Sequence, residues 1–200
     1  MFATVLSGLV RGLEGRVVEV QVDVAPAGSP GFHLVGLASG SVREARERVR
    51  SAIRNTGLSF PPRRLTVNLA PAELSKDGPW LDLAIGVGIC LAELDRRAPA
   101  GAAFVGQLAL DGGVRHVDGV LVLARSLAQQ GVTDLFVPVE DAAEAALAGV
   151  VRVLPCPSLG AVVAHLIGEA RLEPFAGAPA RAAAEPAPEV DLAEVHGQEA

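Results

Sequence analysis

Alternation of apolar and polar residues marks the first part of the chain as β structure. Residues 16–24 place valine at every second position from 18 to 24, with a polar side chain between each of these four valines and the next. A period of two turns one face of a strand toward a core and the other toward water. Residues 2–10 are a second β-rich run, and the break at Glu14-Gly15 predicts a hairpin between the two runs. A third strand is expected at residues 32–37.

A helical period follows at residues 41–54. Apolar side chains recur there every three or four positions and charged side chains occupy most of the others, which predicts an amphipathic helix. Ser39 or Ser41 can cap its start, and Gly57 follows its end. Residues 64–69 alternate again and predict a strand.

Residues 81–94 are apolar nearly all round, which predicts a helix buried at the centre of the fold. Gly78 and Pro79 open this helix, because Gly allows unusual backbone angles and Pro suits the first helical position. Gly86 and Gly88 each cost about 1 kcal/mol relative to Ala unless another backbone packs closely against them.

Strands and helices alternate in the next part of the chain. A hairpin is expected at residues 104–110 and 114–117, around the turn at Gly112 and Gly113. The further expected elements are a helix at 120–130, a strand at 134–138, a helix at 140–147, a strand at 151–154 and a helix at 159–167. This order predicts an α/β (or α+β) fold in one domain.

The expected domain covers residues 1–168. Residues 169–189 are rich in Ala, Pro and Glu, and they predict a flexible linker. Residues 190–200 regain an apolar pattern, so we expect them to start a second module that is cut short.

Composition places this chain among globular proteins. Half of its 200 residues are hydrophobic, which is enough for one sizeable core. No apolar run reaches the ~18 residues needed to span a membrane, and the first residues lack the basic segment of a signal peptide. Cys90 and Cys156 are isolated in apolar surroundings, so buried thiols in a reducing compartment are favoured over a disulfide or a metal site. We therefore expect a cytoplasmic protein.

Charge is segregated along the chain. The net charge is −6, yet seven arginines and only two acids, Glu44 and Glu47, lie between residues 43 and 64. The candidate contact residues are Arg43, Arg46, Arg50, Arg54, Arg63 and Arg64. The first four recur at spacings of three and four, so they share one helix stripe. Three interpretations stay open: binding of DNA phosphates, docking of a protein, or a solvated face with Glu44–Arg48 and Glu47–Arg50 pairs.

A Gly-Pro helix start also precedes the nucleophile in Ser-Lys proteases, but here the next residue is Trp80, and an indole cannot attack a carbonyl. Asp82, in the first turn, is interpreted as stabilising the positive helix end, with a surviving active-site acid as the alternative. Lys76 precedes the motif and is a poor substitute base. The four histidines show no ligand spacing, so no metal site is expected.

Several contiguous stretches resemble the N-terminal domain of the ComM/YifB family of magnesium-chelatase-like AAA+ ATPases. They are Val35-Gly36-Leu37, the arginine-rich run 43–50, the run 60–72 and the Lys76-Asp77-Gly78-Pro79 segment. The tail at 191–198 resembles the entry to the ATPase module of that family.

The resemblance implies a ribosomal-S5-domain-2-like α/β fold, shared with the proteolytic domain of Lon and the C-terminal domain of RadA. The serine and lysine positions of Lon map to Trp80 and Leu121, so no Ser-Lys peptidase is expected. The sequence has no phosphate-binding loop, and ATP and Mg²⁺ are expected only in a downstream module.

By the same resemblance, the whole protein would form a homo-oligomeric ring, a hexamer, that drives DNA branch migration in natural transformation. Its partners would be its own ATPase module, neighbouring subunits and DNA, with no membrane. For this segment we expect a non-catalytic accessory domain that engages DNA or assembles the ring. The alternatives are a purely structural oligomerisation domain and a Ser-Lys type peptidase.

Overall fold

A seven-stranded mixed sheet forms the centre of the computed structural model, which describes residues 1–36, 40–76 and 78–177. The strands of this sheet are β1 (Phe2–Arg11), β2 (Glu14–Val24), β3 (Gly31–Val35), β4 (Arg64–Ala70), β5 (Ala102–Phe104), β8 (Asp134–Pro138) and β9 (Arg152–Cys156). Their order is β3-β4-β2-β1-β5-β8-β9. A separate two-stranded ribbon pairs β6 (Gln107–Leu108) with β7 (Val114–Arg115).

The β1–β2 hairpin supplies the antiparallel centre of the sheet. Its register opposes Val5 to Val20, and the four alternating valines of β2 are fully buried, as their period predicts. Strands β5, β8 and β9 then continue from β1 in parallel, and β3 runs parallel to β4. Because parallel neighbours need crossover connections, helices lie between these strands, and the α/β fold class is confirmed.

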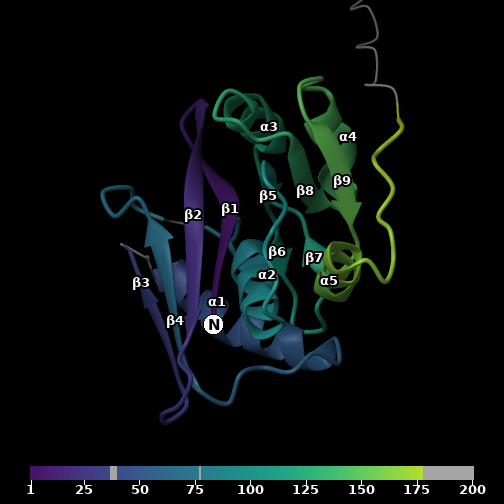
Figure 1. Cartoon of the computed structure of the whole chain (residues 1–200). Coiled ribbons are helices and arrows are strands. Elements are labelled where there is room, and N and C mark those ends of the chain that lie inside the picture. The colour runs from purple at the N-terminus through teal and green to yellow at the C-terminus, as the bar shows by residue number, and fades with distance from the viewer. Residues whose placement is uncertain (37–39, 77, 178–200) are drawn as a thin grey trace, which may run out of the picture.

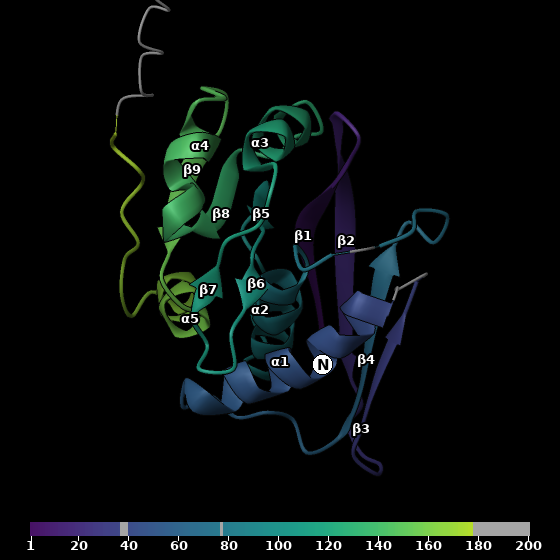
Figure 2. The same cartoon turned by 180° about the vertical axis from the view of Figure 1, so that it is seen from behind.

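In the described residues, five α-helices cover the two faces of the sheet: α1 (Gly40–Asn55), α2 (Asp82–Glu93), α3 (Val120–Ala128), α4 (Ala142–Ala146) and α5 (Leu159–Ile167). Helices α1, α2 and α5 share a core with Phe136 of β8, whereas α3 and α4 share another with its neighbours Leu135 and Val137. Alternate residues of one strand therefore contact different helix layers. Figures 1 and 2 show α1, α2 and α5 grouped at one end of the domain and α3 and α4 at the other.

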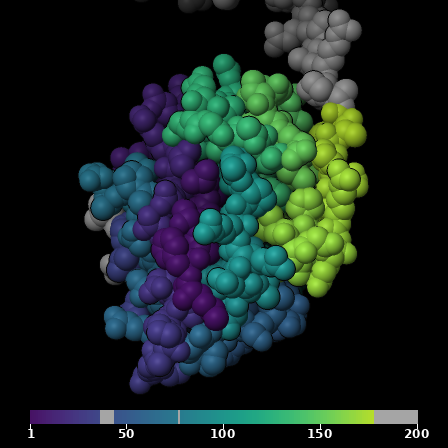
Figure 3. Space-filling view, in the orientation of Figure 1, coloured from purple at the N-terminus to yellow at the C-terminus, as the bar shows by residue number. Residues whose placement is uncertain are grey.

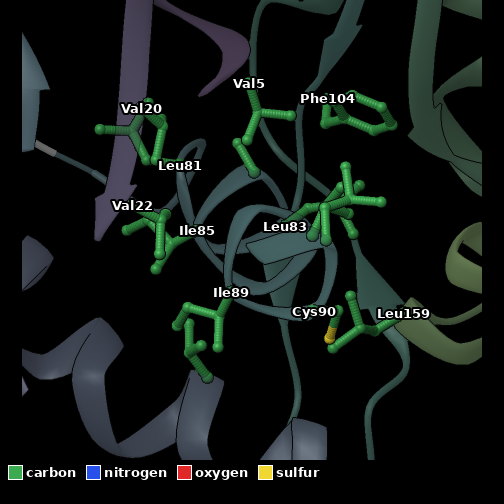
Figure 4. Close-up of a cluster of buried hydrophobic side chains, with 14 of the residues drawn as sticks. Val5, Val20, Val22, Leu81, Leu83, Ile85, Ile89, Cys90, Phe104 and Leu159 are labelled. Atoms are coloured by element: carbon green, nitrogen blue, oxygen red, sulfur yellow. The ribbon is translucent and has the colours of Figure 1, made fainter. Parts of the chain in front are cut away.

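Residues 82–92 of helix α2 are all buried, as the apolar sequence of the helix predicts (Figure 4). A Cβ atom added to Gly88 would lie 2.8 Å from a methyl group of Val5 and 2.8 Å from a methyl group of Val22. The glycine therefore lets the helix approach the β1–β2 hairpin closely. The close neighbours are side chains rather than the backbone that we expected.

The predicted hairpin at residues 104–110 and 114–117 is wrong in its extent. The chain leaves the main sheet after Phe104, and Gly106, with φ 155°, separates β5 from the two-residue strand β6. The local pattern missed this break because β5 finds its partners, β1 and β8, far away in the sequence.

The described part of the segment after α5 lies along the side of the domain (Figure 3). The Leu172 amide donates to Nδ1 of His165 over 3.0 Å, and the Phe175 amide donates to the Val153 carbonyl over 2.9 Å. The rest of the expected linker and the expected start of a second module at 190–200 lie outside the described residues.

Cys90 and Cys156 are free and buried, and burial raises the pKa of the Cys90 thiol to about 12. Within the ranges that the structure describes, no helix is long and apolar enough to cross a membrane.

Candidate nucleic-acid interface

Helix α1 presents a row of arginines on the side opposite the core. Its apolar stripe is buried, while Arg46, Arg50 and Arg54 are exposed. Four-residue spacing places these three side chains above one another, about 6 Å apart along the helix axis. The backbone of Arg43 belongs to the same helix, and its side chain lies outside the described part.

The arginine row borders a pocket of about 370 Å³. Arg63 also lines it, from the loop before β4, and Phe32 and Phe60 contribute from β3 and from the same loop. Arg64 lies one residue beyond Arg63, is exposed and is not part of the lining. Four of the six candidate arginines therefore meet at one place, and they come from two segments of the chain.

The aromatic side chains and the arginines contact one another in this pocket. The ring centroids of Phe32 and Phe60 are 6.0 Å apart and their planes are tilted by 42°. The Arg50 guanidinium lies 5.8 Å from the Phe60 centroid, and Nη1 of Arg46 donates to the Phe32 carbonyl over 3.2 Å. The site combines an apolar wall with a cationic rim.

Acidic partners neutralise only part of this rim. Arg63 donates to Glu93 over 2.7 Å, with both side chains 24% exposed, and Arg46 lies 3.9 Å from the exposed Glu47. In the described part of the chain, Arg50 and Arg54 have no carboxylate at ion-pairing distance. The positive charges of Arg50 and Arg54 are therefore not neutralised by a neighbouring acid in the described residues.

The solvated-face interpretation would pair Glu44 with Arg48 and Glu47 with Arg50, and neither ion pair forms among the described side chains. Arg48 faces α2 and binds Asp82 with two hydrogen bonds, from Nε over 2.7 Å and from Nη2 over 3.2 Å. Glu44 adds only a weaker attraction to Arg48, and Glu47 pairs with Arg46 rather than Arg50. The cause is the packing of α1 on α2. A buried carboxylate without a partner costs more free energy than an exposed one, so Arg48 pairs with Asp82.

Asp82 lies in the first turn of α2 and is 1% exposed. Burial raises the pKa of its carboxyl, while the Arg48 guanidinium and the Leu108 amide oppose that rise. The sequence indicated a role at the helix end and missed the partner, because Arg48 is 34 residues away.

Trp80 and Leu121, the positions to which the resemblance maps the Ser-Lys dyad, lie on neighbouring elements. The Trp80 indole Nε1 donates to the Asp118 carbonyl over 3.0 Å, in the turn that leads into α3, where Leu121 lies. Lys76 is buried, and its Nζ donates to the Pro71 carbonyl. Burial lowers the pKa of Lys76, and Glu73 opposes that shift.

A histidine-centred cluster, which sequence reasoning missed, lies beside this turn. Nδ1 of His116 contacts the buried Asp141 carboxylate, and its Nε2 lies 3.3 Å from Asp118. The His116 amide also donates to Glu140 over 2.7 Å. The bond to Asp141 raises the pKa of His116. No spacing signalled this cluster, because β8 lies between its members in the sequence.

No group of three or more His, Cys, Asp or Glu side chains in the described part of the chain could hold a metal ion. The strongest candidate for a binding site in the described residues is therefore the arginine pocket.

Comparison with known proteins gives consistent matches. A family model described as subunit ChlI of Mg-chelatase matches residues 18–141, which include α1, both pocket phenylalanines and Arg63. The chain is 39% identical over 174 residues to the competence protein ComM of Haemophilus influenzae, covering 85% of this chain and 33% of that protein. It is 38% identical over 191 residues to the protein YifB of Salmonella typhimurium, covering 94% and 37%. An uncharacterized protein of Mycobacterium tuberculosis is 37% identical over 191 residues, again covering 94% and 37%. The chain thus spans about a third of the length of these relatives.

Proposed function

Because this chain belongs to the family of the Mg-chelatase subunit ChlI, among its ComM and YifB members, we propose that it is an accessory domain that engages DNA for an AAA+ ATPase. The observation that carries this proposal is the pocket formed by Arg46, Arg50, Arg54 and Arg63 on a chain of net charge −6. A protein with an acidic total binds DNA only where basic groups are gathered locally. Guanidinium groups are well suited to phosphate oxygens, because they donate in a planar fork.

The wider role is also part of the proposal and rests on the resemblance to the ComM/YifB family. The chain would serve a homo-hexameric ring that moves DNA branches in natural transformation, with ATP and Mg²⁺ bound by a downstream module. A cytoplasmic location agrees with two buried free thiols. The mixed sheet flanked by helices is compatible with the ribosomal-S5-domain-2-like fold that we propose for it.

The domain would be non-catalytic. Trp80 and Leu121 support this part of the proposal, because neither an indole nor an alkyl chain supplies a nucleophile or a base. The Lys76 amine donates to a backbone carbonyl, that of Pro71.

Ring assembly is a second candidate role. Strand β3 is the last strand at one edge of the sheet, and Val35 on it is 46% exposed. A free edge offers backbone donors and acceptors to a strand of a neighbouring subunit. Light scattering over a concentration series measures the molar mass of the chain and so tests this role. A monomer at every concentration would contradict assembly by the isolated domain.

Salt-dependent DNA binding tests the main proposal. Fluorescence anisotropy of the chain with labelled single-stranded and branched DNA should give an affinity that falls steeply with salt. Replacing Arg50 and Arg54 together by Glu should remove that binding, because two phosphate contacts become repulsions. The matched control is the double variant Arg11→Glu/Arg125→Glu, which changes the charge equally at exposed positions on β1 and α3.

The control should bind like the unaltered chain. If neither DNA binds at low salt, or if the two double variants behave alike, the DNA proposal is wrong.

A further inference from the structure

We propose that the pocket bordered by α1 takes up one unstacked nucleotide of a single strand, with its base against Phe32 and Phe60 and its phosphates on Arg50 and Arg54. The inference rests on the proposed DNA engagement and makes it more specific. Its substrate class is single-stranded nucleic acid rather than duplex.

The shape of the site favours a base over a phosphate alone. Phosphates need only exposed cations, whereas this site is a hollow of about 370 Å³ with an aromatic and proline-rich wall. Pockets for small ligands are ~300–1,000 Å³, so this one is at the small end of that range. A hollow of that size suits a single nucleotide and is too small for a duplex.

The two phenylalanines differ from the aromatic pair in the core. Phe104 and Phe136 are stacked, with centroids 4.5 Å apart and planes at 23°, so each covers the other. Phe32 and Phe60 are tilted by 42° at 6.0 Å and are only partly buried. Their geometry leaves ring surface available to a flat ligand, and the Arg50 guanidinium beside Phe60 places a cation next to that surface.

The arginine row offers a path for the phosphates of the strand. Arg46, Arg50 and Arg54 follow the helix in steps of about 6 Å, so they present a line of cations rather than one point. The wall that would face the base consists of Phe and Pro, which contact a base through apolar and ring surface rather than through paired donors and acceptors, while the arginines would be occupied by phosphates. We therefore expect binding with little sequence preference, as on other stacking platforms.

The test distinguishes the contribution of the base to binding from that of the phosphates. Anisotropy titrations of the 200-residue chain would compare an oligothymidylate with an abasic oligomer of the same length, which keeps every phosphate and lacks every base. We expect on the order of tenfold weaker binding of the abasic strand, equivalent to ~1.4 kcal/mol and within the range for stacking of one base on an aromatic ring. A duplex of equal phosphate number should also bind more weakly.

A substitution in the pocket tests whether this preference for strands with bases arises there. Phe60→Leu keeps an apolar side chain without a ring and should remove most of the preference for thymidylate over the abasic strand. The matched control is Phe2→Leu, at a 60% exposed residue outside the pocket, which should keep that preference. A strand that contains 2-aminopurine should show quenched fluorescence on the unaltered chain and less quenching on Phe60→Leu.

Equal binding of thymidylate and abasic strands by the unaltered chain overturns this inference and leaves DNA engagement standing. Absence of binding to all strands removes the proposed function as well. Displacement of the oligomer by equimolar thymidine monophosphate would instead identify a site for free nucleotides and overturn the assignment to a strand. Since the abasic comparison needs no variant, it decides the matter even where Phe60→Leu fails to fold.

Discussion

Removing Arg48 should destabilise the domain in a manner that depends on pH. Its guanidinium binds the buried Asp82 carboxylate through two hydrogen bonds, and the side chains of Arg48 and Asp82 are 22% and 2% exposed. The substitution Arg48→Met keeps most of the aliphatic stem and removes the charge. It leaves Asp82 with the Leu108 amide as its remaining described partner.

Breaking a buried ion pair by removing one member costs about 3–5 kcal/mol, because the other charge stays buried without compensation. Since Arg48 is partly exposed, we expect the lower end, about 3 kcal/mol near neutral pH. Burial already raises the pKa of Asp82 in the folded chain, and loss of Arg48 raises it further. A folded-state pKa above the unfolded value adds stability below the unfolded value, which is lost as the pH rises through the folded value.

The deficit of Arg48→Met should therefore shrink as the pH falls toward the range where Asp82 takes up a proton. The slope can reach about 1.4 kcal/mol per pH unit for one proton. Urea unfolding, followed by the fluorescence of Trp80, the single tryptophan, measures the free energy of unfolding at each pH.

The double variant Arg48→Met/Asp82→Leu is the control, because it removes both charges and should recover most of the lost stability. A deficit below about 0.5 kcal/mol, or one that is constant across the acidic range, would refute this account of the pair.

Three further predictions concern other parts of the fold. Gly88→Ala should lower the free energy of unfolding by about 1 kcal/mol in urea titrations, because overpacking against two valine methyl groups costs ~1–3 kcal/mol and helix propensity returns ~1. The control is Gly160→Ala, whose added Cβ would have no neighbour within 3.4 Å and which should be neutral or stabilising. If both variants changed the free energy of unfolding equally, the close approach of α2 to the β1–β2 hairpin would be contradicted. NMR titration of His116 should give a pKa above its ordinary value that falls in Asp141→Asn, and its stabilising contribution should be lost as the pH rises through that value. A fluorogenic peptide assay should show no turnover by the chain or by Trp80→Ser, and turnover blocked by a serine-directed inhibitor would overturn the non-catalytic assignment.

Local patterns predicted the elements of this fold because their causes are local. The alternating valines of β2 and the 3.6-residue period of α1 depend on backbone geometry within one segment, and the structure has both elements where they were expected. The uniform apolarity of α2 likewise predicted its central place. The hairpin after β5 was misjudged, since the partner strands of β5 lie far away in the chain.

The role of each arginine was beyond the reach of such patterns. The basic stripe of α1 can be derived from the sequence alone, since spacing on a helix fixes which side chains share a face. The packing of α1 on α2 is what turns Arg48 inward to Asp82 while Arg50 and Arg54 stay free of acids in the described chain. The tertiary structure also placed an aromatic wall next to that stripe, because contacts between β3, α1 and the loop before β4 arise from the packing of layers and not from any local period.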